Sequence, residues 1–344
     1  MSKLRWGILG TGHIAGVYAR GVAASQSGAL AAVGSRAPAS AARFAREFGV
    51  PRAHGSYADL LADPAVDAVY VATPHPDHAS WAIRAAQVGK HVLCEKPLTL
   101  TRAEAEPVVA AARAAGVLLM EAFMYRCHPQ TAKVVELVAG GALGRVGLVQ
   151  ATFSFAADPN LANRWWNLAL GGGGILDIGC YPVSFARLVA GAADGQPFAD
   201  PVSVTGAGYL HPETRVDAYA AATLKFANGV VAQVACGVGL TQDNSARIYG
   251  RDGWLHIPVP WKPADETGTS RITLFRRGAA GPEEFVFTAG PLYALEADAF
   301  GAAVAAGKRE APQMTIADTL GNMAVLDQWR AAVGVVYPGE AAAG

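Results

Sequence analysis

Residues 4–120 alternate short apolar runs with segments of helical spacing, and this order constrains the fold more than any other feature of the sequence. The apolar runs lie at residues 4–9, 29–34, 66–72, 91–94 and 117–120. The helical segments lie at residues 17–24, 39–48, 57–61, 78–88 and 102–115. The run at residues 66–72 is continuously apolar in character, as expected of a parallel strand buried on both faces. This alternation predicts a doubly wound parallel sheet.

A glycine turn separates the first strand from the first helix, in the order Gly10-Thr11-Gly12-His13-Ile14-Ala15. The first glycine allows the tight turn, the second lets the backbone approach a pyrophosphate, and the small Ala15 permits close packing of helix on strand. The helix N-terminus then offers unpaired N–H groups to the phosphates. Such turns also occur in sheets that bind nothing, and the position in the first strand–helix unit favours a dinucleotide. We expect Gly10, Thr11, Gly12, His13 and Ile14 to contact it.

The second strand ends in Ser35-Arg36, where NAD-specific folds usually place an Asp or Glu on the ribose 2′-hydroxyl. A serine hydroxyl and a guanidinium suit a 2′-phosphate instead. One charge-assisted bond contributes about 1.5 to 3 kcal/mol, or roughly 10- to 150-fold in affinity. The sequence therefore predicts NADP as the preferred cofactor, with NAD bound more weakly. The alternative is that Arg36 is only a surface arginine opening the next helix.

Two further loops follow strands at the edge where open α/β sheets bind ligands. The first is Thr73-Pro74-His75-Pro76-Asp77-His78, for which we expect a wall around the nicotinamide ribose, with His78 opening the next helix. A metal site at the two histidines is not expected, because no third ligand of the right type lies nearby. The second is Cys94-Glu95-Lys96-Pro97, in which the proline ends the strand and leaves Lys96 at its carboxyl end.

The pattern changes after Glu121, where apolar runs follow one another without helices between them. They lie at residues 149–155, 202–209, 219–226, 230–238, 245–249, 254–257 and 272–275. Strands in succession predict a mainly antiparallel sheet, and Asn228-Gly229 predicts a hairpin between two of them. The alternation indicates one covered and one open face. We therefore expect a Rossmann domain at residues 1–121 and an α+β domain at residues 122–344. Its last helices, at residues 292–306 and 315–333, should pack back on the first domain.

Within the second of these domains lies a group of residues able to move a proton. It comprises Asn163-Arg164-Trp165-Trp166 and Gly171-Gly172-Gly173-Gly174-Ile175-Leu176-Asp177-Ile178-Gly179-Cys180-Tyr181-Pro182. Four consecutive glycines indicate either a close ligand approach or a mobile turn, the alternative being a plain flexible loop. If the next segment is helical, Asp177 and Tyr181 share one face. Pro182 would then kink that helix or restrict it to its first turns.

These motifs together resemble the glucose-fructose oxidoreductase/inositol dehydrogenase (Gfo/Idh/MocA) family, from the first strand to the last helix. Within it, the chain is most similar to the branch of dimeric dihydrodiol dehydrogenases and NADP-dependent D-xylose dehydrogenases. Inositol dehydrogenases usually carry His where this chain has Tyr181. The resemblance rests on the glycine turn, Thr73-Pro74 with His78, Glu95-Lys96-Pro97, Met120-Glu121-Ala122-Phe123-Met124-Tyr125-Arg126 and the segment from Gly172 to Pro182.

The resemblance implies hydride transfer between nicotinamide and a sugar or cyclic polyol, with Lys96, Asp177 and Tyr181 on the family's catalytic positions. It also implies subunit contact through the open sheet, giving a homodimer or homotetramer. The candidate cofactor contacts are Gly10, Thr11, Gly12, His13, Ile14, Ser35, Arg36, Thr73, Pro74, His75, His78, Glu95, Lys96, Arg164 and Trp165. The candidate substrate contacts are Lys96, Arg126, Trp165, Asp177 and Tyr181.

The free energy needed to lower the pKa of a tyrosine can be compared with the energy that a nearby lysine supplies. A free tyrosine has a pKa of about 10, so acting at neutral pH requires about 4 kcal/mol of help. An ammonium at ~4 Å supplies about that much at an effective dielectric of about 20. Tyr181 would exchange a proton with the substrate oxygen. Lys96 would lower the pKa of Tyr181 and hold that oxygen, and Asp177 would orient a neighbouring hydroxyl. Keto-sugar reduction is an alternative, as are a non-catalytic NADP-binding sensor and, less favoured, a metal-dependent hydrolase. The sequence leaves the sugar, and the direction of the reaction, open.

Composition excludes several classes of partner. Lys plus Arg (28) equals Asp plus Glu (28), so no net field attracts nucleic acid or an anionic membrane. The cysteines at 94, 127, 180 and 236 form no Cys-x-x-Cys pair, and with no secretory leader a reducing cytoplasm is expected. No apolar run is expected to approach the ~20 residues that span a bilayer. The Ala-rich tail after Pro338 shows no interpretable pattern.

Overall fold

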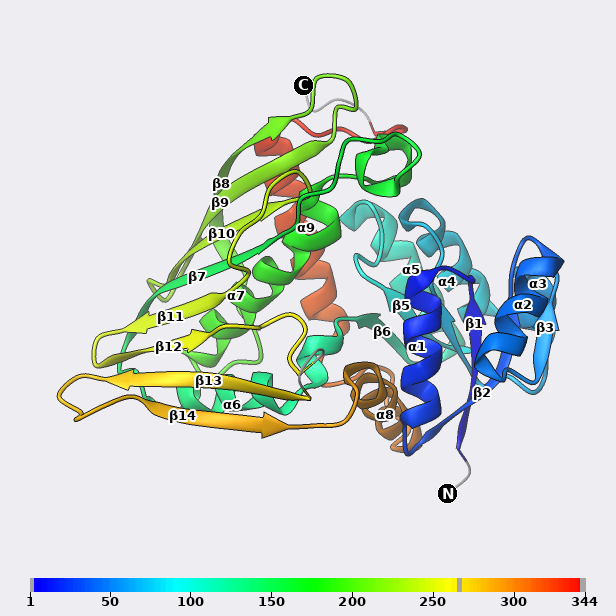
Figure 1. The fold of residues 1–344 in the computed structure, drawn as a ribbon, viewed down its shortest axis with the longest axis horizontal. Coiled ribbons are helices and arrows are strands. Elements are labelled where there is room, and N and C mark those ends of the chain that lie inside the picture. The colour runs from blue at the N-terminus through cyan, green and yellow to red at the C-terminus, as the bar shows by residue number, and fades with distance from the viewer. Residues whose placement is uncertain (1–2, 265–267, 341–344) are drawn as a thin grey trace. The chain divides into compact units, whose positions relative to one another are not determined.

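The computed structural model describes residues 3–264 and 268–340 (Figure 1). The chain divides into two compact units. The first contains the chain up to His128 together with Gly290–Leu320, and the second contains Pro129–Ala289 and the chain from Gly321 onward. The first unit is therefore discontinuous in sequence.

The first unit is built on a six-stranded parallel sheet in the order β3-β2-β1-β4-β5-β6. This order confirms the predicted doubly wound sheet. Its strands are β1 (Leu4–Leu9), β2 (Gly28–Gly34), β3 (Arg52–His54), β4 (Ala68–Val71), β5 (His91–Glu95) and β6 (Leu119–Ala122). Its helices are α1 (His13–Ala24), α2 (Pro38–Phe48), α3 (Tyr57–Ala62), α4 (His78–Gln87), α5 (Arg102–Ala115) and α8 (Leu292–Ala305), with short 3-10 helices η1 (His75–Asp77) and η2 (Met124–Cys127).

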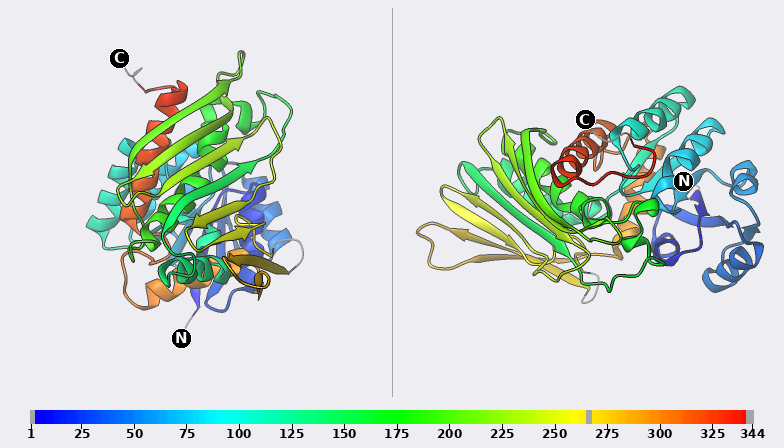
Figure 2. Two further views of the ribbon diagram at one scale, coloured as in Figure 1. Left: turned by 90° about the vertical axis from the view of Figure 1, so that its left-hand side faces the viewer. Right: turned by 90° about the horizontal axis from the view of Figure 1, so that it is seen from above.

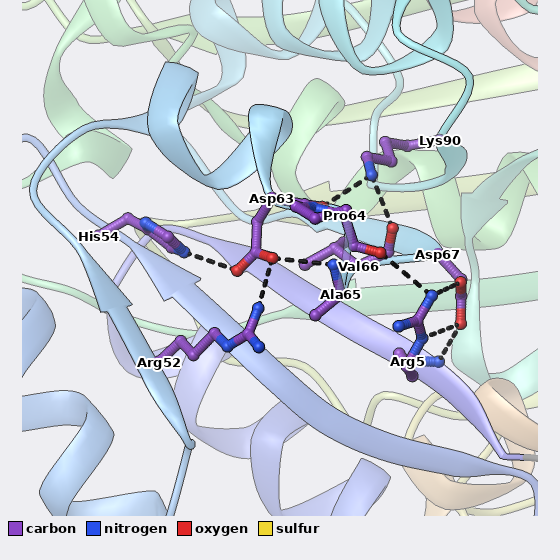
Figure 3. Close-up of polar contacts among 9 residues, drawn as sticks. All are labelled: Arg5, Arg52, His54, Asp63, Pro64, Ala65, Val66, Asp67 and Lys90. Carbon is purple, nitrogen blue, oxygen red and sulfur yellow. Dashed lines mark hydrogen bonds and ion pairs between the residues drawn. The ribbon is translucent and has the colours of Figure 1, made fainter.

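Charged residues at the amino ends of the strands form a polar network (Figure 3). Arg5 in β1 binds Asp67, just before β4, through its backbone N–H and its guanidinium. Lys90, just before β5, donates to the carbonyls of Asp63 and Val66. This network lies at the end of the strands opposite to the ligand-binding edge, so it holds the sheet together rather than forming a site.

Helix α8 packs against α1 in the first unit. Gly21 of α1 permits the close approach, because a Cβ there would lie 2.5 Å from Cβ of Tyr293. Trp6 of β1 contacts Phe300 of α8, with ring centroids 4.9 Å apart. The return of residues 290–320 therefore completes the core of the first unit.

The second unit is built on an eight-stranded sheet in the order β14-β13-β12-β11-β7-β10-β9-β8. Only the β10–β7 pairing among the described strands of this sheet is parallel, which confirms a mainly antiparallel sheet. The strands are β7 (Val146–Ser154), β8 (Pro201–Leu210), β9 (Asp217–Phe226), β10 (Val231–Gly237), β11 (Ala246–Gly250), β12 (Gly253–Ile257), β13 (Thr269–Arg276) and β14 (Glu283–Thr288). The helices are α6 (Pro129–Ala139), η3 (Arg164–Trp166), η4 (Leu168–Leu170), the π-helix η5 (Ile175–Gly179) and α7 (Cys180–Ala192), while α9 (Ile316–Val333) begins in the first unit and continues into the second.

One face of this sheet is covered and the other is open, as the alternation predicted. Buried and exposed residues alternate along β9, and in the left view of Figure 2 the strands face the viewer with helices behind them. Helix α9 approaches β8 closely at Gly206, where a Cβ would lie 2.9 Å from the indole of Trp329. The predicted hairpin at Asn228-Gly229 is also present, joining β9 to β10 with Gly229 at φ +88°.

Several elements were not predicted. Strand β3 has three residues, too few for a periodic pattern, and β14 lies at the sheet edge with exposed Glu283 and Glu284. Helix α7 continues through Pro182 to Ala192, so the proline does not restrict it to its first turns. The wide π turn directly before α7 gives a physical reason, since a proline otherwise clashes with the carbonyl four residues earlier.

The expectation that no apolar run is long enough to span a bilayer was wrong. The stretch Leu168–Ala192 passes that test by length and composition, and all of its most apolar window is buried inside the protein. The buried core helix of a globular unit meets the same criterion, so this stretch is weak support for a membrane span. Its apolar character reflects burial of α7 under the sheet.

Candidate cofactor site and active site

The glycine turn after β1 has the geometry that a dinucleotide requires. Gly10 has φ +118°, and a Cβ there would lie 2.6 Å from the carbonyl oxygen of Ala72, so no other residue fits. Gly12 is the N-cap of α1, and a Cβ there would meet nothing within 4 Å. The first glycine is thus required by the fold, whereas the second leaves open space at the helix end, where a ligand can approach the backbone.

The N-terminus of α1 is available to an anion. Among the described residues no side chain caps this helix, so its first N–H groups are left for a ligand such as a pyrophosphate. Thr11, Gly12 and His13 line a pocket of about 190 Å³ together with Ser40 and Arg43 of α2. Ile14 follows in the same first turn, and Ala15 is fully buried against the sheet.

Ser35 and Arg36 follow β2 at the same edge. The backbone N–H of Ser35 donates to the carbonyl of His54 at 3.2 Å, which fixes the position of its side chain. Its hydroxyl oxygen accepts from the N–H of Ala37 at 3.3 Å, leaving the O–H proton able to donate. Arg36 is exposed and lies close enough to Tyr57 to oppose the rise in the pKa of Tyr57 that burial causes. A hydroxyl donor and an exposed cation therefore occupy consecutive positions after β2.

The loop after β4 contains a buried hydroxyl without a partner. Thr73 is 7% exposed, and its Oγ1 has no hydrogen-bond partner within residues 3–264 and 268–340. His75, after Pro74, is also buried, and its ring lies 5.5 Å from that of His78, centroid to centroid. The Thr73 hydroxyl is a group that a bound cofactor can satisfy.

The sequence predicts that the loop containing His78 lines the nicotinamide ribose, but the side chain of His78 is buried between two loops of the protein. Its ring is fully buried, with Nδ1 2.9 Å from the carbonyl oxygen of Pro97 and Nε2 2.9 Å from that of Thr73. The ring therefore joins the loop after β4 to the loop after β5. This geometry favours a role in positioning these loops over direct contact with a ligand.

Lys96 lies at the carboxyl end of β5, as predicted, and precedes a cis peptide bond to Pro97. Its backbone N–H donates to Oε2 of Glu95 at 3.2 Å, and Tyr70 donates its hydroxyl proton to the other carboxylate oxygen of Glu95. Glu95 is buried, while Lys96 is half-buried. The carboxylate is thus held by the fold, and the lysine side chain stands at the ligand-binding edge.

Arg126, a predicted substrate contact, is buried in the first unit. Its Nη2 lies 2.6 Å from Oδ2 of Asp318, and the two side chains are 3% and 4% exposed. The neighbouring Asp318 carboxylate raises the pKa of the Arg126 guanidinium, although burial opposes this. This contact ties η2 to the first turn of α9.

Asp177 and Tyr181 lie in the second unit, on the π-helix and in the first turn of α7. Both are buried, and Nη2 of Arg164 donates to Oδ1 of Asp177 at 2.9 Å. Arg164 itself is 43% exposed in its side chain, so the pair joins a buried carboxylate to a partly solvated cation. The arginine expected to contact the cofactor is thus a partner of the predicted catalytic aspartate.

Aromatic rings surround Tyr181. Phe153 and Trp261 lie 5.2 and 6.0 Å from it, centroid to centroid, and Nε1 of Trp261 donates to the carbonyl of Thr152 at 2.7 Å. Trp165 packs on Phe155 nearby in the sequence, at 4.7 Å. Such rings can cover the apolar face of a sugar or a cyclic diol.

The sequence did not point to Phe153 or the buried Asp217, and it included Trp261 only within the segments at residues 155–170 and 236–262 that are expected to set the substrate specificity. Phe153 lies within a strand pattern, Trp261 follows the last predicted central strand, and Asp217 begins β9. The only available signal was the interruption of an apolar pattern by a carboxylate at Asp217. No group of three His, Cys, Asp or Glu side chains within the described residues could hold a metal ion.

The residues of the first unit fit NADP. The open space at Gly12, the uncapped helix, the unpartnered Thr73 hydroxyl and the Ser35-Arg36 pair supply places for the phosphates and for polar groups of a dinucleotide. The first unit thus contains Lys96 and the candidate cofactor residues from Gly10 to Glu95, and the second contains the candidate cofactor residues Arg164 and Trp165 together with Asp177 and Tyr181.

Comparison with known proteins agrees with this description. Residues 4–123 match the GFO_IDH_MocA family, described as "Oxidoreductase family, NAD-binding Rossmann fold", and residues 131–256 match the GFO/IDH/MocA C-terminal domain. The chain is 32% identical to trans-1,2-dihydrobenzene-1,2-diol dehydrogenase of Mus musculus over 97% of this chain and 98% of that protein. It is 37% identical to D-xylose 1-dehydrogenase (NADP(+)) 2 of Haloferax volcanii over 94% of this chain and 95% of that protein. A 3-ketoreductase from Actinomadura kijaniata, solved with NADP and TDP-benzene, superposes with a TM-score of 0.86 and 32% identity, covering 96% of this chain and 98% of that one.

Proposed function

Because the chain belongs to the Gfo/Idh/MocA oxidoreductase family, we propose that it transfers a hydride between NADP and a carbon of a sugar or cyclic polyol. The observation that carries the proposal is that each unit contains functional groups that this reaction requires. Lys96 directly follows β5 in the first unit. In the second unit, Asp177 lies on the π-helix η5, and Tyr181 lies in the first turn of α7 beside the rings of Phe153 and Trp261. The reaction class is that of an NADP-dependent dehydrogenase or reductase acting on CH–OH groups.

The residues divide the work as follows. Tyr181 exchanges a proton with the substrate oxygen, Lys96 favours the phenolate and holds that oxygen, and Asp177 orients a neighbouring hydroxyl. The tyrosine requires about 4 kcal/mol to act at neutral pH, and an ammonium at ~4 Å supplies about that amount. Bound NADP accepts or supplies the hydride.

Arg164 positions Asp177 in this proposal. Its guanidinium donates to Oδ1 of the carboxylate, and the carboxylate accepts a further hydrogen bond from a substrate hydroxyl. The indole of Trp165, beside Arg164 at the loop that precedes the glycines, walls the nicotinamide or the sugar. Arg126 stays a candidate substrate contact only if its ion pair with Asp318 opens.

Ser35 and Arg36 give the preference for NADP over NAD. The hydroxyl donates to the 2′-phosphate and the guanidinium balances its charge, while no carboxylate follows β2 to bind a free ribose 2′-hydroxyl. The similarity to an NADP-dependent D-xylose dehydrogenase and to a reductase solved with NADP supports this assignment.

Reduction of a keto sugar is the second candidate reaction. The similarity to a 3-ketoreductase supports it, whereas the dihydrodiol and D-xylose dehydrogenases support oxidation. Tyr181 can serve in either direction, because the same phenol donates the proton in reduction and accepts it in oxidation.

We further propose a cytoplasmic homodimer or homotetramer formed through the open sheet face. A groove of about 630 Å³ crosses that face, with Ala207, Ala221 and Ala235 in register across its strands. Tyr209 and Tyr219 stack beside them and are 45% and 40% exposed. Small residues beside exposed aromatic rings suit the packing of a second sheet. The four cysteines are free, as in a reducing compartment.

The test is a titration of NADPH and NADH by fluorescence, followed by turnover on aldoses, keto sugars and cyclic diols. NADPH preference with turnover of one of these classes is the expected result. Tyr181→Phe should abolish turnover and keep NADPH binding, and Tyr249→Phe, on the outer face of β11, is the matched control. NADPH binding without turnover across the panel would favour an NADP-binding sensor, and NADH preference would contradict the assignment of Ser35 and Arg36.

A further inference from the structure

Asp217 is a fully buried carboxylate directly behind the glycine run of residues 171–174. It is the first residue of β9 and is 0% exposed. Its Oδ2 accepts the backbone N–H of Ile175 at 2.6 Å, and it also bonds to the backbone of Gly174. Ile175 begins the π-helix on which Asp177 lies, so the carboxylate satisfies N–H groups at the amino end of that helix.

Asp217 leaves no room for a side chain at Gly173. Gly173 has φ +112°, and a Cβ there would lie 2.0 Å from Oδ1 of Asp217. A Cβ on Gly174 would lie 3.1 Å from Cα of Gly237. Close contact with the carboxylate therefore explains Gly173, and the backbone of β10 restricts Gly174.

A second contact holds the same run from the C-terminal segment. The hydroxyl of Tyr337 donates to the carbonyl of Gly172 at 2.9 Å, and the ring is 1% exposed. Glu340 fixes this segment, because its Oε2 accepts the N–H of Tyr337 at 2.6 Å and its carboxylate binds both Nη atoms of Arg330 at 2.9 Å. The segment after α9 is thus anchored at the glycine run.

We propose that Asp217 is a positioning residue for the proposed reaction, and that together with Tyr337 it fixes the glycine run from which the helix carrying Asp177 and Tyr181 begins. The inference rests on the roles proposed for Asp177 and Tyr181. Asp217 reaches them through Gly174 and Ile175, with two residues between Gly174 and Asp177, so a shift of the helix start moves both side chains together.

The expected effect follows from the cost of misplacing reacting groups. A displacement of about 1 Å can reduce turnover roughly 100-fold. Asp217→Ala removes the acceptor for Ile175, so we expect kcat to fall between about 10- and 100-fold. The dissociation constant for NADPH should stay unchanged, because the candidate cofactor residues after β1 and β2 belong to the first unit.

The experiment measures kcat, KM and NADPH affinity for Asp217→Ala, Asp217→Asn and Tyr337→Phe on the folded protein. Asn retains an oxygen that accepts from Ile175, so Asp217→Asn should restore most of the kcat lost in the alanine variant. Tyr337→Phe keeps the ring and loses only the bond to Gly172, so a smaller fall in kcat is expected. Asp194→Asn and Tyr249→Phe are the matched controls, because Asp194 is exposed just after α7 and Tyr249 pairs with Leu148 in the sheet.

The outcomes separate this inference from the proposed function. Native kcat in both Asp217 variants, with Tyr181→Phe inactive, would overturn the inference and leave the proposed function standing. A purely structural role would also overturn it, and would appear as lower stability with native kcat for the folded fraction. Equal turnover in the wild type and Tyr181→Phe would instead contradict the proposed function.

Discussion

The ion pair between Arg126 and Asp318 offers the sharpest test of how the first unit is held together. Both side chains are almost fully buried, and the guanidinium and carboxylate are 2.6 Å apart. Replacing one partner leaves the other as an uncompensated buried charge, at a cost of about 3 to 5 kcal/mol. For a unit of this size, each kcal/mol lowers the melting temperature by about 2 to 4 °C. Arg126→Met or Asp318→Asn should therefore lower it by about 6 to 20 °C.

The double variant Arg126→Met/Asp318→Asn distinguishes the pair from either residue alone. With neither charge buried, it should be less destabilised than the sum of the two single variants. Arg5→Met is the matched control, because the Arg5–Asp67 pair is equally short at 2.6 Å but its side chains are 48% and 33% exposed. Removing an exposed pair should cost no more than about 1 kcal/mol.

The appropriate assay is thermal and urea unfolding followed by circular dichroism, which give the melting temperature and the free energy of unfolding, with KM measured on each variant. The buried pair predicts strong coupling between the two substitutions and a KM unchanged in the double variant. Additive effects, or a loss no larger than that of Arg5→Met, would refute the argument from burial. An increased KM in the stable double variant would instead support the substrate contact expected for Arg126 from the sequence.

Three further predictions concern the cofactor, stability and assembly. Arg36→Ala should weaken NADPH binding about 10- to 150-fold and leave NADH unchanged in a fluorescence titration, with Arg46→Ala as control; equal losses for both cofactors would contradict it. Burial, and to a lesser extent Glu95, raises the pKa of Glu296 well above its ordinary 4.5, so the folded state retains this proton to higher pH and stability falls as pH rises. Glu296→Met should therefore stabilise the protein more at pH 8 than at pH 5 in thermal unfolding, and a pH-independent effect would be inconsistent with the shift. Ala221→Arg on the open sheet face should dissociate the oligomer in light scattering, whereas Ala302→Arg should not; an unchanged mass would exclude this face.

Much of the first unit could be predicted because its signals are local. The apolar runs, the glycine turn and the proline after Lys96 each act over a few residues, and the strands that they predict match the observed strands to within about two residues at each end. The hairpin at Asn228-Gly229 is local in the same way, since glycine adopts its positive φ without cost. These elements needed no knowledge of which residues meet across the fold.

The features that could not be predicted from the sequence depend on contacts between residues far apart in the chain. Asp217 lies 42 positions after Ile175, and Tyr337 lies 165 positions after Gly172, so no spacing in the sequence reveals either bond. The bond between Arg164 and Asp177 spans 13 positions, so the sequence does not reveal it either. The tail after Pro338, which showed no pattern, contains Glu340, whose role depends on Arg330.

The same limit applies to the length of α7. Its proline predicted a short or kinked helix from local rules, and the sequence gives no local sign of the π turn that precedes it. Burial of the whole helix then accounts for the apolar stretch that resembles a membrane span. Both the length of α7 and its apolar composition therefore depend on tertiary packing rather than on local propensity.

The most direct test of the proposed chemistry is single-turnover kinetics with NADP and a substrate from the panel, comparing the wild type with Lys96→Met and Tyr181→Phe. Nicotinamide absorbance follows the hydride, and fluorescence gives the affinity for NADPH in each variant. The proposed roles predict a loss of at least about 100-fold in the rate of hydride transfer for both variants, with NADPH affinity retained. Near-native transfer in either variant with intact NADPH binding would contradict the assignment of Lys96 and Tyr181.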